Sequence, residues 1–175
     1  MVWLRVLNGK GAYLDDRALQ DVLNYCMQES KTPNALIGGW AVNPEKAVEE
    51  MSLFTKLTGK DEGLHLRHFE ISFDPKTFKE HKKAFEIAKR CAQYYGDNHQ
   101  IVYAVHEDTE HVHAHFVMNT VRYTDCKKYR GTRKDFYAFR QYSTKALRDA
   151  GLRDKLDYIP ESEYLQKKRS AVRQQ

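Results

Sequence analysis

The sequence predicts an α+β fold, in which helices cover one face of a mainly antiparallel sheet and the other face carries histidines. Two observations predict it. Segments with apolar residues at helical spacing alternate along the chain with segments in which polar and apolar residues alternate one by one. Two of the latter, 100–106 and 111–121, are separated by four residues, which is typical of an antiparallel hairpin. Helices interleaved with strands, plus one hairpin, favour an α+β sandwich.

The first elements are a short strand and an amphipathic helix. Residues 2–7 are mainly apolar and predict the strand. Asp15 or Asp16 can cap the next helix, because a carboxylate accepts the backbone N–H groups of a first turn. Apolar residues at helical spacing over 18–27 form its buried stripe. Residues 35–42 fit either a strand or an irregular apolar segment, since two glycines interrupt them.

Further helices and strands follow in order. A helix begins at Asn43, where a capping side chain precedes a proline, and ends at Gly59. Residues 64–73 alternate and predict a strand. Asp74 with the next proline predicts the start of a helix that ends at Gly96. The remaining elements are the hairpin, a helix over 135–150 and a charged, helical tail over 153–175.

Composition excludes several classes of protein. The chain has 175 residues and a net charge of +5, which suits one domain with a sizeable core. With 41% hydrophobic and 30% charged residues, a disordered or fibrous chain is excluded. No apolar run approaches the roughly 20 residues of a membrane span, and no signal peptide opens the chain. Three cysteines far apart argue against a disulfide scaffold and favour a reducing cytoplasm.

Positive charge is concentrated in the second part of the chain. Residues 1–75 carry 8 basic and 11 acidic groups, whereas residues 122–155 carry 11 basic and 4 acidic groups interleaved with six aromatic residues. Basic groups attract a phosphate backbone, and aromatic rings stack on unpaired bases. This pattern favours nucleic acid as a partner, but it also fits a solvated helix face with aromatic residues in the core. The candidate DNA contacts are Arg122, Lys127, Lys128, Tyr129, Arg130, Arg133 and Lys134.

Four of the eight histidines lie on the predicted hairpin. His111, His113 and His115 point to one face of a strand, and His106 can join them from the partner strand. Imidazoles this close repel one another when protonated, and a divalent metal gives the clustering a reason, because it binds the neutral ring. Imidazole suits Mn, Zn, Co or Ni, whereas Mg is a weaker partner for three nitrogens. The alternative is a polar sheet face whose histidines only form hydrogen bonds.

Other residues are candidates for supporting roles. Asp108 is either an acceptor for an imidazole N–H or a turn residue. Asn119 lies further along the histidine face, where it is a candidate to orient a metal ligand or to contact DNA. His68 shares a strand face with Ser72, and the alternative is a histidine bonded to a neighbour. Tyr25 lies at the flank of the apolar stripe of the first helix and can leave the core. Its alternative is a tyrosine across the helix edge with its hydroxyl in water.

Several stretches resemble the motifs of a known family. Residues 106–119 are similar to the three-histidine motif of plasmid mobilisation relaxases, the MobA/VirD-like members of the HUH endonuclease superfamily. Residues 23–32 resemble the amino-terminal motif, with Tyr25 at the place of the nucleophilic tyrosine. Residues 68–73 resemble the strand of the middle motif, and residues 125–151 the segment after the histidines.

The resemblance covers about residues 14–152, with the motifs in the family's order. It implies an HUH relaxase fold with an RRM- or ferredoxin-like core, as a single nicking domain over residues 1–175. Relaxases usually continue into helicase, primase or partner-binding regions, for which 175 residues are too few.

The resemblance implies that the enzyme nicks and rejoins single-stranded DNA at an origin of transfer during conjugative mobilisation. The Tyr25 hydroxyl attacks one phosphodiester, which leaves a 5′-phosphotyrosyl link and a free 3′-OH; the covalent link stores the bond energy for rejoining. A divalent metal held by His106, His113 and His115 polarises the phosphate. The expected metal is Mn or Mg in turnover, with Zn, Co or Ni in a crystal. The expected setting is the bacterial cytoplasm without a membrane, with accessory mobilisation proteins and a type IV secretion coupling protein as partners.

Within this resemblance, two assignments stay open. Tyr13 is a second candidate for the nucleophile, and some relatives use a histidine, which keeps His65 and His68 as candidates. His111 adds a histidine to the usual pair, so it can replace His106 in the ligand set.

Three other functions fit parts of the sequence. A histidine-triad nucleotide hydrolase would use residues 111–117 without a metal, but it leaves His106 and Tyr25 unexplained. A non-catalytic RRM-like module would bind single-stranded nucleic acid through aromatic residues. A replication initiator or transposase of the same superfamily would share the chemistry and differ in biology.

Overall fold

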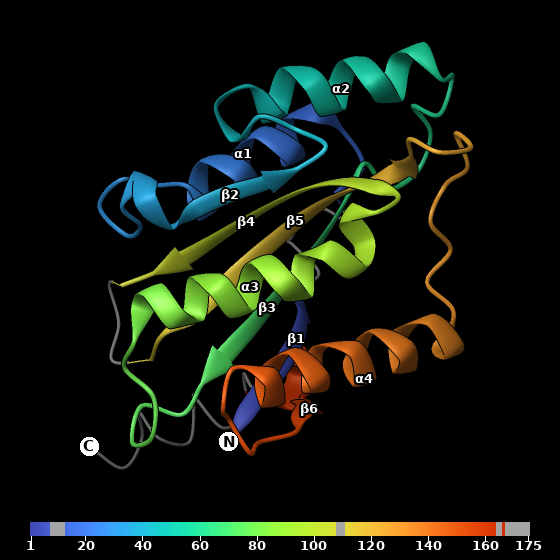
Figure 1. Ribbon diagram of the computed structural model, residues 1–175. Coiled ribbons are helices and arrows are strands. Elements are labelled where there is room, and N and C mark those ends of the chain that lie inside the picture. Colours follow the sequence, from blue (N-terminus) through green and yellow to red (C-terminus); the bar gives the residue numbers. More distant parts are fainter. Residues whose placement is uncertain (8–12, 108–110, 164–165, 167–175) are drawn as a thin grey trace.

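The computed structural model describes residues 1–7, 13–107, 111–163 and 166, which form a six-stranded sheet between layers of helices (Figure 1). Neighbouring strands are antiparallel, except that the edge strand β6 runs parallel to β1. The predicted α+β class with a mainly antiparallel sheet is therefore confirmed. In sheet order the strands are β2 (Ile37–Trp40), β4 (His99–His106), β5 (His113–Arg122), β3 (Leu66–Phe73), β1 (Val2–Leu7) and β6 (Leu156–Tyr158).

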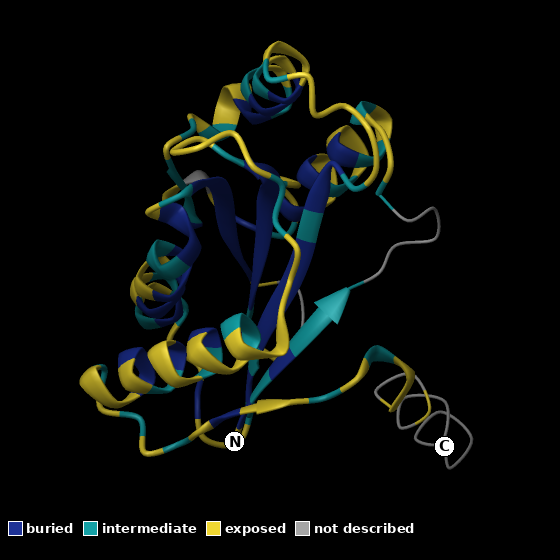
Figure 2. Cartoon of the chain, turned by 90° about the vertical axis from the view of Figure 1, so that its right-hand side faces the viewer, coloured by how far each residue is buried: buried dark blue, intermediate teal, exposed yellow. Residues whose placement is uncertain are grey.

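Helices cover both faces of the sheet, whereas the sequence predicted one face only. The reason is that the hairpin is apolar on both faces: β4 presents Ile101 and Tyr103 to one core, and Val102, together with Val117 of β5, to a second core. Figure 2 shows the buried sheet between helices whose outer sides are exposed. The four α-helices that pack on the sheet are α1 (Asp16–Cys26) and α2 (Ala47–Leu57) on the histidine face, and α3 (His81–Gly96) and α4 (Arg133–Asp149) on the other.

The start of α1 is confirmed and the start of α3 was predicted wrongly. Asp15 caps α1 by accepting the backbone N–H of Ala18 at 2.7 Å. After β3, the carbonyl of Asp74 accepts the N–H of Phe78 at 2.9 Å, which closes a single turn that does not continue into α3. The helical turn ends there because the ring of Phe78 stacks on Phe73, with centroids 4.4 Å apart. The chain has to change direction after this contact before α3 can cover the sheet.

Other boundaries differ less. Strand β5 begins at His113, so His111 precedes it, and α4 begins at Arg133 with Thr132 as its cap. Strand β6 lies inside the segment that was predicted to be helical; its three residues are too few to predict from a pattern. Residues 161–163 are helical, while residues 8–11, Asp108 and most of the remaining tail lie outside the described residues.

Residues 35–42, which fitted either a strand or an irregular segment, contain the short edge strand β2. Gly38 is needed there, because a Cβ at this position would lie 2.3 Å from Cζ of Tyr103 on β4. Ile37 and Gly39 flank this close approach, and Trp40 pairs with Ile101. In the described ranges, no helix combines the length and apolar character needed to cross a membrane.

The aromatic core under α3 and α4 gives a test of the packing. Phe116 is fully buried and its ring stacks on Phe69 at a centroid distance of 4.7 Å. We expect Phe116→Ala to lower the free energy of unfolding by about 3–5 kcal/mol, because the cavity it leaves cannot collapse fully. Urea titration measures the loss. The control Tyr137→Phe, at a side chain that is 61% exposed, should stay within about 0.5 kcal/mol of wild type; similar losses in both variants would contradict this packing.

Candidate active site

Three histidines come together where β4 ends and β5 begins. In the register of the hairpin, His106 pairs with His113, and His115 follows two residues later on the same face. Ring centroids are 4.4 Å apart for His106 and His115, 4.9 Å for His106 and His113, and 5.1 Å for His113 and His115. One nitrogen of each ring lies within 4.8 Å of the others. The structure therefore groups the three residues that the resemblance indicated as ligands.

Hydrogen bonds decide which nitrogen of His106 and of His113 carries the proton. Nε2 of His106 donates to the carbonyl oxygen of Cys26 at 2.9 Å, and Nδ1 of His113 donates to that of His111 at 2.8 Å. Because a carbonyl only accepts, the lone pair of the neutral ring is on Nδ1 of His106 and on Nε2 of His113. A second hydrogen bond of this kind is the usual way in which metal-binding histidines are oriented.

The tautomer of His115 follows from a chain of contacts. Burial, and then the charge of Glu70, raises the pKa of the Cys26 thiol, which stays protonated and donates to Nε2 of His68 at 3.5 Å. Nε2 of His68 is therefore an acceptor, so Nδ1 of His115, 3.0 Å away, donates to it. The lone pair of His115 is then on Nε2, which is buried and has no hydrogen-bond partner within the described part of the chain.

Burial lowers the pKa of His115 and of His68. It holds the pKa of His115 well below its ordinary value, with a further contribution from the neighbouring histidines. Burial, and then the charges of His106 and Arg5, lowers the pKa of His68 to about 3. Neutral imidazole is the form that binds a metal, and the grouped nitrogens of His106, His113 and His115 fit a divalent cation.

Helix α1 places Tyr25 beside these histidines. Its ring centroid lies 5.6 Å from that of His106 and 5.5 Å from that of His115, in edge-on contacts. The side chain is 45% exposed, because α1 buries Leu23 and Cys26 and leaves Tyr25 at the flank of the apolar stripe. The Nζ atom of Lys31 lies 3.9 Å from the ring centroid. A hydroxyl-bearing ring, a cation and three candidate metal ligands therefore share one site.

The other candidate nucleophiles are arranged differently. His68 is buried, and its Nδ1 donates to the hydroxyl oxygen of Tyr13 at 3.2 Å, so Tyr13 reaches the histidine group through His68. His65 belongs to a separate group, in which Nδ1 contacts Asp16 at 3.1 Å and Nε2 the carbonyl oxygen of Asp61 at 3.0 Å.

Two further candidates lie apart from the group of ligand nitrogens. Asn119 is fully buried and donates to Gln100 at 3.0 Å and to the carbonyl oxygen of Met51 at 3.3 Å, so it joins α2 to the hairpin. His111 is exposed before β5, and its carbonyl oxygen accepts the hydrogen bond from Nδ1 of His113. Among the described residues, two groups of candidate ligands lie on this face, and neither contains His111: one is His106, His113 and His115, and the other is Cys26, His68 and His115.

Sequence reasoning missed Glu70 and Arg5. Glu70 is buried on β3 opposite His115; one carboxylate oxygen accepts from Arg5 at 2.5 Å, and the other lies 3.9 Å from Nε2 of His115. The signal that could have found it is an acidic residue between His68 and Ser72 on alternate positions of a strand. The Arg5 guanidinium balances the charge of this buried carboxylate, so an ion pair lies beside the candidate ligands.

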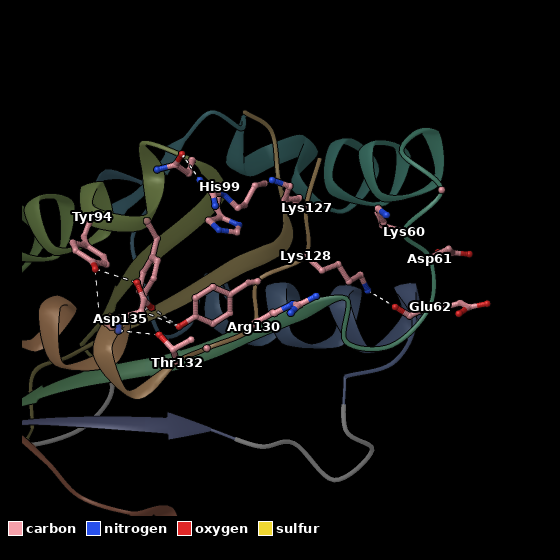
Figure 3. A pocket seen from close by; sticks show the side chains of 16 residues that line it. Lys60, Asp61, Glu62, Tyr94, His99, Lys127, Lys128, Arg130, Thr132 and Asp135 are labelled. Atoms are coloured by element: carbon pink, nitrogen blue, oxygen red, sulfur yellow. Dashed lines mark hydrogen bonds between the residues drawn. The ribbon is translucent and has the colours of Figure 1, made fainter. Parts of the chain in front are cut away.

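The basic segment lies around a cavity at the other end of the hairpin. This cavity measures about 1280 Å³; Figure 3 shows Lys60 on one side of it and Lys127, Lys128 and Arg130 along the segment that precedes α4. Five of the seven candidate DNA contacts line it, and Arg133 lines a neighbouring cavity of about 350 Å³. Lys134 lines neither of these two cavities. The five are Arg122, Lys127, Lys128, Tyr129 and Arg130.

Comparison with known proteins identifies the class. The family model described as "Relaxase: MobA/VirD2-like, nuclease domain" matches residues 23–152, which include Tyr25 and the three grouped histidines. The chain is therefore an enzyme, a DNA relaxase endonuclease. Within that class it belongs to the MobA/VirD2-like relaxases, as the motifs of the sequence predicted.

The similarity of the chain to solved structures is weaker than its match to the family model. A chain from the solved structure described as "Molecular Basis of Vancomycin Resistance Transfer in Staphylococcus aureus" is similar at 15% identity and a TM-score of 0.47, over 67% of this chain and 69% of that chain. No curated protein matches the chain significantly.

Proposed function

We propose that the chain cuts and rejoins one strand of DNA at an origin of transfer through a covalent bond between Tyr25 and a 5′-phosphate. One observation carries the proposal: the exposed ring of Tyr25 contacts the rings of His106 and His115 edge-on. Cleavage of a phosphodiester requires a nucleophile and, close to it, positive charge on the phosphate oxygens. Tyr25 and the metal ligands would supply both within one site.

In this proposal, His106, His113 and His115 would hold a divalent cation, Mn or Mg in turnover, and such an ion would supply Lewis-acid polarisation of the scissile phosphate. The hydroxyl oxygen of Tyr25 attacks phosphorus, the bond to the 3′ oxygen breaks, and the tyrosine proton leaves to solvent, which reaches the exposed ring. Lys31 attracts the phosphate oxygens electrostatically. The released 3′ oxygen takes up a proton, and the reverse attack rejoins the strand.

We infer the domain, the substrate and the partners of the reaction from the same family. Residues 1–175 act as one nicking domain in the bacterial cytoplasm, and single-stranded DNA at the origin is the substrate. Accessory mobilisation proteins and a type IV secretion coupling protein are the expected partners in conjugative mobilisation. The basic segment from Arg122 to Lys134 contacts the DNA, because all of its cations except Lys134 line the larger cavity or its neighbour.

The test is to incubate the protein with single-stranded oligonucleotides from a mobilisation origin that are labelled at the 3′ end, with Mn²⁺ or Mg²⁺, and to run a denaturing gel. The proposal predicts a labelled band at the size of the protein plus DNA, which disappears when a chelator is added. Binding that leaves no denaturant-resistant band would favour a non-catalytic module. Metal-free hydrolysis of a nucleoside phosphoramidate would favour a histidine-triad hydrolase.

A first prediction concerns His68 as a positioning residue. We expect His68→Phe to weaken Mn²⁺ binding by about 10- to 100-fold, because His115 loses the acceptor that keeps its lone pair on Nε2. His68→Gln should restore part of the affinity, since its amide oxygen can accept the same hydrogen bond. Isothermal titration of metal into each variant measures the effect. Equal affinity in wild type and His68→Phe would show that the contact does not orient His115.

A second prediction concerns the basic segment. The affinity for single-stranded DNA should fall steeply with salt, and Arg130→Gln should reduce the slope of log K against log salt by about one, since one phosphate contact is lost. Fluorescence anisotropy between about 50 and 200 mM salt measures the slope. Arg148→Gln is the control, because it removes the same charge at an exposed position in the last turn of α4. A flat salt response of the wild type would contradict the assignment.

A further inference from the structure

The smaller cavity, of about 350 Å³, lies between α4 and the strands β1 and β3. Its walls are mainly aromatic and aliphatic, and its volume is at the lower end of cavities that hold small ligands. It shares Tyr95, Tyr129, Gly131 and Thr132 with the larger basic cavity. A strand whose phosphates lie in the larger cavity can therefore place one base in the smaller. The aromatic walls are Phe69, Tyr95, Tyr129, Phe136, Phe139 and Tyr158.

The charged groups of this cavity are hydrogen-bond donors. Arg67 and Arg133 line it, and Nε of Arg67 is buried without a hydrogen-bond partner among the described residues. The guanidinium of Arg67 lies 5.6 Å from the ring centroid of Tyr129. The hydroxyls of Tyr95 and Tyr129 are engaged with Asp135, at 3.0 and 2.7 Å. A ligand that satisfies Arg67 must therefore bring acceptors of its own.

Gly131 leaves the space that such a ligand needs. A Cβ at this position would lie 2.9 Å from an amino group of Arg67, and Gly131 has a φ of 63°, which favours glycine. The loop before α4 can therefore pass close to the guanidinium without covering it with a side chain. Figure 3 shows the hydrogen bond between Thr132 and Asp135 that holds the end of this loop at the start of α4.

The chemistry of the cavity selects one ligand class. A flat ring fits between aromatic walls, and the fork of an arginine matches two adjacent acceptors on one edge of that ring. Guanine presents such a pair in O6 and N7, whereas adenine presents one acceptor and one donor at the same edge. We propose that this cavity binds an unstacked guanine base of the DNA strand, with Arg67 reading its O6 and N7 atoms. The inference rests on the proposed function in so far as it takes single-stranded DNA as the substrate.

His68 is among the residues that line the smaller cavity, but Arg67 faces away from the site of cutting. Arg67 and His68 are successive residues of β3, so their side chains point to opposite faces of the sheet. His68 contacts His115 on the face of α1, whereas Arg67 lies under the loop before α4. The base read by Arg67 is therefore not the base at the scissile phosphate, and it sets where the strand is held rather than how the bond breaks.

The test uses dodecamers of thymidine that carry one central guanine, adenine or 7-deazaguanine, which lacks the N7 acceptor. Binding is measured by fluorescence anisotropy in the presence of a chelator, so that cutting does not interfere. We expect wild type to bind the guanine oligonucleotide about tenfold or more tightly than the other two. Arg67→Gln should lose the preference for guanine, while the control Arg148→Gln should keep it.

Two results would overturn the guanine site: equal binding of the three oligonucleotides by wild type, or a guanine preference that survives in folded Arg67→Gln. If Arg67→Gln does not fold, the comparison of guanine with 7-deazaguanine in wild type decides alone. A guanine preference without any covalent adduct would leave this site standing and remove the nicking proposal. An adduct without a guanine preference would do the reverse.

Discussion

Replacing Tyr25 by phenylalanine is expected to abolish the covalent adduct with DNA and to leave single-strand binding unchanged. Phenylalanine keeps the ring that contacts His106 and His115 and lacks the hydroxyl oxygen that would attack phosphorus. The metal ligands and the basic segment are untouched, so the DNA should still be bound. A denaturing gel measures the adduct, and anisotropy measures binding on the same preparation.

Two companion variants make this result specific. Tyr137→Phe, at an exposed tyrosine of α4, should form the adduct like wild type. Tyr13→Phe should also form the adduct, because the Tyr13 hydroxyl is bonded to His68 and is joined to the metal ligands only through that ring. An adduct that persists in Tyr25→Phe and disappears in Tyr13→Phe would move the role of the nucleophile to Tyr13.

The second large effect is expected from the double variant His113→Ala, His115→Ala. It removes two of the three grouped nitrogens, so metal binding and cleavage should be lost together. A Lewis acid on a phosphate contributes several kcal/mol, so the rate of cleavage should fall about a thousandfold or more. Metal analysis of the purified protein after Mn²⁺ loading, with cleavage measured on the same sample, checks both losses.

His111→Ala is the matched control for the ligand set. The His111 side chain lies outside the nitrogen group, and the backbone carbonyl that orients His113 is retained in alanine. Metal content should therefore stay at the wild-type level. Loss of metal in His111→Ala, or unchanged metal in the double variant, would overturn the assignment of His106, His113 and His115.

The hairpin and its histidine face could be predicted because they depend on local alternation. Positions two apart on a strand share a face whatever the rest of the fold does, so His113 and His115 had to be neighbours. Their approach to His106 followed from the short turn. The flank position of Tyr25 followed in the same way from the spacing of apolar residues on α1. What spacing could not show is that α1 packs on the histidine face.

Predictions failed where the outcome depends on contacts between distant segments. Val102 and Val117 belong to a second core, which alternation alone does not separate from a partly exposed sheet face. An aspartate before a proline is typical of any turn, and here Asp74 closes a single turn before α3.

The supporting residues of the candidate site were equally hidden. The ion pair of Arg5 and Glu70 joins residues that are 65 positions apart in the sequence. The hydrogen bond between His68 and His115 joins residues that are 47 positions apart. The smaller cavity likewise depends on how the loop before α4 passes over Arg67 of β3. Local spacing carries no information on such approaches, so they appear only in the folded chain.

The most direct test of the central proposal is to map the residue that carries the DNA in the wild-type adduct. Trypsin should release Tyr25 in the peptide 18–31, which contains no other tyrosine and no histidine, whereas Tyr13 lies in the peptide 11–17. Tandem mass spectrometry after nuclease trimming should find the nucleotide phosphate on Tyr25 of peptide 18–31. A nucleotide on peptide 11–17, or on any histidine, would contradict Tyr25 as the nucleophile.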